Sequence, residues 1–304
     1  MLQPEEFDVG RITWGDTVFE RFDVDQANPL KDLVRRRRMR PADKVLVVER
    51  AGKRLAFSLY QMTYHHVAQG ELAGQPFILS FCAICHSATT MVPVLDDGKL
   101  YHFTCVGVYN GMALLRDDET GSYWDHISGE CLHGPNKGEV MELIPVEHIT
   151  VEQALKRWPD LKISYSIQPW HRRWILEPVM NLFGDRGIFP PKFRLSMGKK
   201  DTRLPEMVSG LGVHTKKTKR FYTIGTIQEA GGELKDRVDG RPVTVSLSLD
   251  GYPQAVFDGS EEKPMQLYCR WYGFSFTFPG CELFGEPPEA KEETAASAEK
   301  TESK

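Results

Sequence analysis

The sequence lacks several features that would place the protein in a familiar class. Its 304 residues contain no apolar run of about 18 residues, the length that a helix needs to cross a bilayer. The first residues show no basic segment followed by an apolar one, so we expect no secretory signal, no membrane span and a cytoplasmic protein. A glycine-rich phosphate loop, a His-Glu-x-x-His motif and a Gly-x-Ser-x-Gly motif are absent, which leaves nucleotide-binding, zincin and esterase functions without support.

The sequence also lacks an excess of positive charge and a high cysteine content. The net charge is −4 and the pI is near 6.2, so we expect no nucleic-acid partner. The one basic run, residues 35–40, is typical of a solvated turn, with steering of an anionic partner as the alternative. Six cysteines in a chain of this length indicate free thiols in a reducing compartment: Cys82, Cys85, Cys105, Cys131, Cys269 and Cys281. A small molecule or another protein is the kind of partner that we expect.

The most informative segment is a strand-like run followed by two cysteines. Residues 77–81 are apolar and lead directly into Cys82-Ala83-Ile84-Cys85-His86-Ser87. Two thiols three positions apart, where a strand gives way to a turn, can point into one small volume and share a metal or form a disulfide. We give these two interpretations equal weight, and both rank above a third in which the cysteines are small core residues.

A metal site needs further ligands, because a catalytic zinc takes at least three protein donors. His65 is the best third participant, and His126 beside Asp125 is a further imidazole, so the candidate metal ligands are Cys82, Cys85, His65 and His126. Cys82, Cys85 and His65 are also the candidate catalytic residues. These residues do not identify a cofactor, and a transition metal such as zinc is the candidate that they suggest. Among the chemical roles of the cysteines, a nucleophilic-cysteine hydrolase with His65 or His126 as base ranks third, after metal binding and reversible disulfide formation.

An internal repeat separates scaffold from site. The first half contains three segments that recur in the same order in the second half: 53–59, 70–72 and 74–80, then 219–224, 232–234 and 240–246. This repeat predicts an α+β fold dominated by antiparallel strands, with two related β-rich units and short helices. In the alignment Cys82 falls opposite Ser248, Cys85 opposite Gly251 and His65 near Gly231. The fold therefore requires neither thiols nor an imidazole at these positions, which favours a functional role for them.

The domain organisation follows from composition. We expect an N-terminal extension at 1–44, a first β-rich unit with the Cys-x-x-Cys motif at 45–164, a connecting arm at 165–205, a second β-rich unit at 206–285 and a disordered tail at 286–304. The pattern Thr150-Val151-Glu152-Gln153 is typical of a capping box, and it predicts a helix that runs to Trp158 and ends at Pro159.

Several motifs stand in the order of one known family: Gly52–Leu59, His65, Gly74–Pro76, Phe81–Ala88, Gly107–Asn110, Asp118–Trp124, Ser128–Glu130 and Gly134-Pro135. Together they resemble the bacterial and archaeal "domain of unknown function 3179" family over roughly residues 45–284. That family usually shows His-Glu followed by an Asn-Asp pair, where this chain has His65-His66 and then Gln69-Gly70. The resemblance implies a fold and a site location, and the family carries no established activity.

The sequence therefore predicts a metal- or thiol-dependent enzyme or redox factor centred on Cys82 and Cys85. The alternative is a non-catalytic binding or assembly module in which the two cysteines are structural. Both an enzyme and a non-enzymatic protein fit the sequence.

Overall fold

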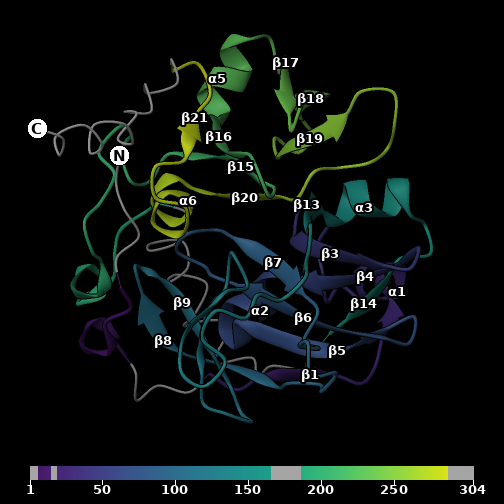
Figure 1. Ribbon diagram of the computed structural model, residues 1–304. Helices are drawn as coiled ribbons and strands as arrows, with labels where there is room; N and C mark the ends of the chain where they lie inside the picture. The colour runs from purple at the N-terminus through teal and green to yellow at the C-terminus, as the bar shows by residue number, and fades with distance from the viewer. Residues whose placement is uncertain (1–5, 15–18, 166–185, 287–304) are drawn as a thin grey trace, which may run out of the picture.

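The computed structural model describes residues 6–14, 19–165 and 186–286, and strands dominate these ranges (Figure 1). The few helices are short, as the sequence predicts: α1 (Leu30–Arg35), α2 (Leu59–His65), α3 (Val151–Arg157), α5 (Ile224–Glu229) and α6 (Trp271–Thr277), with 3-10 turns η1 (Val9–Arg11) and η3 (Phe193–Ser196). Within these ranges, no helix has the length and hydrophobicity needed to cross a membrane. Residues 166–185 of the expected arm and 287–304 of the expected tail lie outside the described residues.

The first two sheets each combine a central hairpin with strands from elsewhere in the chain. The first has the order β13-β3-β4-β14-β2, with β2 (Asn28–Pro29), β3 (Lys44–Arg50), β4 (Lys53–Ser58), β13 (Glu147–Thr150) and β14 (Lys162–Ser164). The second has the order β1-β5-β6-β7-β12, with β1 (Phe22–Val24), β5 (Val67–Leu72), β6 (Gln75–Phe81), β7 (Ala88–Met91) and β12 (Leu143–Ile144).

The other three sheets contain the rest of the strands. The third has the order β11-β10-β9-β8, with β8 (Phe103–Tyr109), β9 (Met112–Asp117), β10 (Tyr123–Asp125) and β11 (Cys131–His133). The fourth has the order β20-β15-β16-β21, with β15 (Ser209–His214), β16 (Lys219–Thr223), β20 (Gln266–Arg270) and β21 (Glu282–Leu283). The fifth has the order β17-β18-β19, with β17 (Glu233–Val238), β18 (Arg241–Leu247) and β19 (Pro253–Phe257).

The five sheets meet one after another in a ring, like the blades of a propeller. β4 packs against β5, and β5 packs against β8, which joins the first three sheets. The Tyr272 hydroxyl, on α6, donates to the Gly111 carbonyl at 2.9 Å and links the third sheet to the fourth. β15 packs against β19, and the Thr150 N–H donates to the Asp250 carboxylate at 2.9 Å, so that the fifth sheet returns to the first.

This arrangement corrects the prediction of two repeated β-rich units. The matched segments are β4, β6 and their counterparts β16 and β18, and in each half the two strands belong to different sheets. The short helices α2 and α5 carry the chain from one sheet to the next at equivalent points. The repeat therefore reflects two consecutive sheets in each half, and the repeating unit of the structure is the single sheet.

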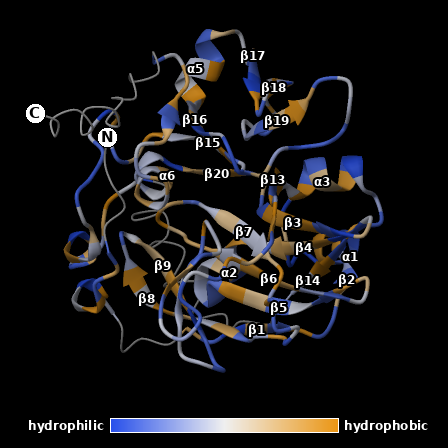
Figure 2. Ribbon diagram, viewed as in Figure 1, coloured by the Kyte–Doolittle hydropathy of each residue, from blue (hydrophilic) through white to orange (hydrophobic). Residues whose placement is uncertain are grey.

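The apolar character of the first hairpin explains its central place. Leu46 and Val48 pack in one core cluster, and Val45 and Val47 on the opposite face pack in another. Both faces of β3 are thus buried over residues 45–48, which agrees with the continuous apolar run there (Figure 2). The turn of this hairpin lies at Ala51-Gly52, and both residues have the positive φ that a tight hairpin requires.

The helix predicted from the capping box is confirmed. The Thr150 hydroxyl accepts the Gln153 N–H at 3.3 Å, which satisfies one of the backbone donors that a helix start leaves free. α3 then runs to Arg157 and ends at Trp158, directly before Pro159.

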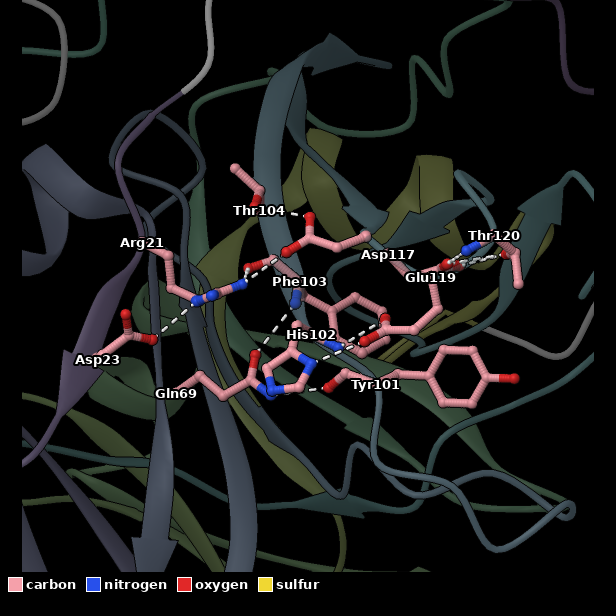
Figure 3. Close-up of polar contacts among 11 residues, drawn as sticks. Arg21, Asp23, Gln69, Tyr101, His102, Phe103, Thr104, Asp117, Glu119 and Thr120 are labelled. Carbon is pink, nitrogen blue, oxygen red and sulfur yellow. Dashed lines mark hydrogen bonds and ion pairs between the residues drawn. The ribbon is translucent and has the colours of Figure 1, made fainter.

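The Thr-Gly-Ser-x-Trp motif, residues 120–124, is organised around the buried carboxylate of Asp117, whose contact with Thr120 is drawn in Figure 3. Asp117 accepts the Thr120 N–H at 2.6 Å and the Thr120 hydroxyl at 2.8 Å. Its other oxygen accepts the indole N–H of Trp124 at 2.8 Å, and both Asp117 and Trp124 are fully buried. The next residue, Asp118, is partly exposed and accepts from Arg21 at 2.8 Å. The motif therefore fixes the turn between β9 and β10.

Replacing Asp117 by Ala would leave the Trp124 and Thr120 N–H groups buried without their acceptor. We expect the free energy of unfolding to fall by about 3 kcal/mol, because each unsatisfied buried donor costs about 1–3 kcal/mol. The matched control is Asp118→Ala, which removes a partly exposed ion pair and should cost about 1 kcal/mol or less. Guanidinium unfolding followed by tryptophan fluorescence measures both, and equal losses would contradict the assignment.

Candidate functional site

The turn at residues 82–87 joins β6 to β7 and carries both sulfurs of the Cys-x-x-Cys motif inward. The Cys82 N–H donates to the Ser87 carbonyl at 3.0 Å and closes the turn just after the last strand pair, Phe81 with Ala88. His86 takes a left-handed φ of 59°, which lets the chain reverse direction within so few residues. Cys82 and Cys85 belong to the core cluster that includes residues of the second, third and fourth sheets.

His126 reaches the same place from the loop after β10. The neighbouring Asp125 carboxylate accepts the N–H groups of Ile127 and Ser128 at 2.8 and 2.7 Å, which fixes the backbone of this loop. The His126 Nε2 atom lies 3.7 Å from the Cys85 sulfur. The ligand atoms of Cys82, Cys85 and His126 all lie within 4.8 Å of one another, and all three side chains are buried.

Ser87 connects the thiol to the imidazole. Its Oγ atom lies 2.7 Å from the Cys85 sulfur and 3.2 Å from the His126 Nε2 atom. Ser87 is fully buried. The hydroxyl therefore occupies the space beside two of the three candidate ligands, and it can donate to one and accept from the other.

The two thiols differ in acidity. Burial raises the pKa of Cys82, but the Cys85 thiol and the backbone N–H groups of Cys85, Ala113 and Ile84 outweigh this effect and lower it below its ordinary value. The pKa of Cys85 is raised well above its ordinary value by burial and by the neighbouring Cys82 sulfur. The environment thus favours a thiolate at Cys82 beside a protonated thiol at Cys85.

His126 is a neutral imidazole at physiological pH. Burial lowers its pKa to about 3, and the field of His66 adds to this effect. Its Nδ1 atom is buried and has no hydrogen-bond partner among the residues that the structure describes. A neutral imidazole has one nitrogen lone pair to offer, which is the form that binds a metal.

The structure places the expected ligand His65 away from the two thiols. Its Nδ1 atom lies 2.6 Å from the Glu20 carbonyl oxygen, and its ring contacts that of Phe22, on β1. The next residue, His66, has a left-handed φ of 58°, and its Nδ1 atom lies 2.9 Å from the Phe81 carbonyl oxygen. Cys82, Cys85 and His126 are therefore brought together, and the grouping does not include His65.

Two residues near the site were given no role in the sequence analysis. Ser87 stands within the Cys-x-x-Cys-His-Ser motif, so its position was visible, but only the turn geometry shows its contact with Cys85. His66 follows the last residue of α2, where the backbone changes direction, and this change sends adjacent histidines to different places. The end of the helix between His65 and His66 is the feature of the sequence that could have indicated their different positions.

Buried hydroxyl groups flank the thiols on the same sheet. Ser80 and Thr89 are paired across β6 and β7, and Ser80 is two residues before Cys82, so these side chains share one face of the sheet. Both hydroxyls are fully buried and have no hydrogen-bond partner among the described residues. Such groups usually bind ordered water or a ligand, because an unsatisfied buried hydroxyl is costly.

Cys131 and His133 do not join this group. Cys131 is buried on β11 and its sulfur lies 3.5 Å from the His133 carbonyl oxygen. The His133 side chain is exposed and stacks on Phe7. Burial raises the pKa of Cys131 to about 11 and that of Cys105 to about 12. These cysteines have the protonated character of core residues, unlike Cys82.

Fold and site together define a β protein of five sheets in a propeller-like ring, with a buried cluster of two thiols and an imidazole. The chain belongs to the family described as protein of unknown function (DUF3179), whose family model matches residues 24–265. This match confirms the resemblance that the motifs indicated. Comparison with curated proteins found no match, and comparison with solved structures found none either.

All six cysteines are buried free thiols, so the native protein should react slowly with Ellman's reagent. We expect less than about one fast-reacting thiol per chain in the folded state, and all six after unfolding in guanidinium. Absorbance at the released thionitrobenzoate band gives both values. Two fast thiols, of which one is lost in Cys82→Ser and the other in Cys85→Ser, would show that the pair is open to solvent.

Proposed function

We propose that this protein binds a thiophilic transition metal ion through Cys82, Cys85 and His126, with zinc as the first candidate. The observation that carries the proposal is the convergence of three ligand atoms within 4.8 Å of one another on buried side chains. Two thiolates and an imidazole are soft or borderline donors, which suit zinc and copper(I) and disfavour magnesium or calcium.

The protonation states support this proposal. Metal ligands must be deprotonated, and the Cys82 environment already favours its thiolate. His126 is neutral, so it binds without losing a proton from a charged ring. The Cys85 proton would be released on binding, because the positive ion stabilises a second thiolate that burial alone disfavours.

Three protein ligands leave a fourth position of a tetrahedral ion open. Sites with a full set of four protein donors are usually structural, whereas three donors plus water or substrate are typical of catalytic zinc. Ser87 and the hydroxyls of Ser80 and Thr89 provide polar groups on this side of the core. We therefore infer a metal-dependent enzyme that acts on a molecule small enough to reach a buried ion, since all three ligand side chains are buried.

A reversible dithiol–disulfide pair is the second candidate. The opposite pKa shifts of Cys82 and Cys85 favour it, because thiol–disulfide exchange uses one thiolate and one protonated partner. Burial argues against it, since a partner sulfur must approach the attacking thiolate and only 4% of the Cys82 surface is exposed. We rank metal binding first for this reason.

Zinc titration against a chromophoric chelator separates these functions. We expect about one equivalent in the wild-type protein, and more than about 100-fold weaker binding in Cys82→Ser and in His126→Ala, because loss of a second-shell partner alone costs about 10–100-fold. Cys105→Ser is the matched control, since Cys105 is a buried cysteine outside the ligand group. His65→Gln tests the ligand that the sequence favoured, and it should bind zinc as the wild type does.

Equal zinc affinity in Cys82→Ser and Cys105→Ser would contradict the metal proposal. If the wild-type protein binds no metal and loses two mass units per chain on mild oxidation, the dithiol interpretation replaces it. If neither occurs and both cysteine variants only lose stability, the cysteines are structural and the protein is a binding or assembly module.

A further inference from the structure

A cleft opens where the ring of sheets closes. Its volume is about 760 Å³. Its walls come from β3, β4, β13 and the end of α3 on one side and from β19, β20 and their loops on the other. Small-molecule sites typically occupy about 300–1,000 Å³ and often lie between two structural units. The cleft therefore has the size and the position of a ligand site.

One wall carries a buried imidazole among aromatic rings. His148, on β13, lines the cleft and is 8% exposed, and its Nε2 atom has no hydrogen-bond partner among the described residues. Its ring lies 5.4 Å from that of Tyr252 and 5.3 Å from that of Tyr268. Burial lowers the pKa of His148 to about 3, so the ring is neutral at physiological pH. A buried polar atom without a partner in a cleft indicates a place for a ligand group.

Charged side chains from both walls meet at Glu147, on β13. Arg157 and Lys263 both contact the carboxylate of Glu147, with the lysine at 3.2 Å, so two cations share one anion. Arg54 has its own partner in Glu49 at 2.8 Å. The end of α3 adds Trp158 to the lining, with the Arg157 guanidinium 4.5 Å from its ring centre. The lining as a whole is electrically neutral, because Glu261 adds a third carboxylate to its three cations. At Glu147, however, two cations share one carboxylate, and this local excess of positive charge favours a single ligand carboxylate.

We propose that this cleft binds a small planar organic anion, such as an aromatic carboxylate, with its ring among the aromatic side chains and its carboxylate at Lys263 and Arg157. His148 offers the ring system a hydrogen bond from the buried wall. The aromatic lining selects a flat, apolar body, and the paired cations select one negative charge.

The cleft is separate from the candidate metal ligands, but β20 contacts both. Tyr268 also contacts the ring of His86, the residue after Cys85, at 6.1 Å between ring centres. Two residues further along β20, the Arg270 N–H donates to the Cys85 carbonyl at 2.8 Å. The proposal rests on the residues of the cleft alone and does not depend on a bound metal.

Three probes of one shape test the charge preference: indole-3-acetate, its neutral amide and tryptamine, titrated calorimetrically into the full chain. We expect the acid to bind about tenfold more tightly than the amide, because a charge-assisted hydrogen bond contributes about 1.5–3 kcal/mol. Tryptamine should bind least, since its ammonium group would meet Arg157 and Lys263.

Two variants locate the binding. Lys263→Gln should weaken the acid about tenfold and leave the amide unchanged. Lys216→Gln, an exposed lysine that does not line the cleft, is the matched control and should bind as the wild type does. His148→Phe should weaken both ligands while the melting temperature stays equal or rises, because it removes a buried atom without a partner.

The absence of binding by all three probes at millimolar concentration would overturn the proposal. Equal affinity for acid and amide, or unchanged acid binding in Lys263→Gln, would overturn the assignment of an anion. A loss of stability in His148→Phe with unchanged binding would show that His148 only packs the wall.

Discussion

The turn between β6 and β7 is the constraint on which the site depends. One backbone hydrogen bond, from the Cys82 N–H to the Ser87 carbonyl, holds six residues in a loop that places both sulfurs in the core. The loop leaves little free space around it, since a Cβ added to Gly273 of α6 would lie 3.2 Å from the Cys85 Cβ atom. Thiol separation, thiol acidity and burial are therefore set together by one local structure.

The ring of sheets supplies the rest of the site. The Cys82 sulfur faces the Ala113 N–H at the start of β9, and His126 comes from the loop after β10. The second sheet therefore supplies the two thiols of the cluster, and the third sheet supplies its imidazole. The fourth sheet covers this cluster with α6 and binds the Cys85 carbonyl through β20. At the far side of β20, where the fifth sheet meets the first, the same architecture leaves a cleft with aromatic and cationic walls. The chain thus combines a buried cluster of candidate metal ligands with an open cleft beside it.

Local features were predictable from the sequence, and long-range ones were not. The Thr150 cap and the Cys-x-x-Cys turn each depend on a few adjacent residues, and both were found where expected. The grouping of His126 with the thiols depends on the pairing of distant sheets, and the separation of His65 from them depends on where α2 ends. The sequence predicted two units where the structure has five sheets. Residues 22–29 and 143–164 complete sheets whose other strands come from elsewhere in the chain, and such non-local pairing leaves no periodic signal in the sequence.

X-ray absorption at the metal edge, on protein purified without added chelator or metal, tests the central claim most directly. We expect a shell of two sulfur atoms at about 2.3 Å and one nitrogen at about 2.0 Å, with a further light atom at the open position if the metal is zinc. In His126→Ala the nitrogen contribution should fall. An absent edge, or a shell of oxygen and nitrogen atoms without sulfur, would contradict a metal centre at Cys82 and Cys85.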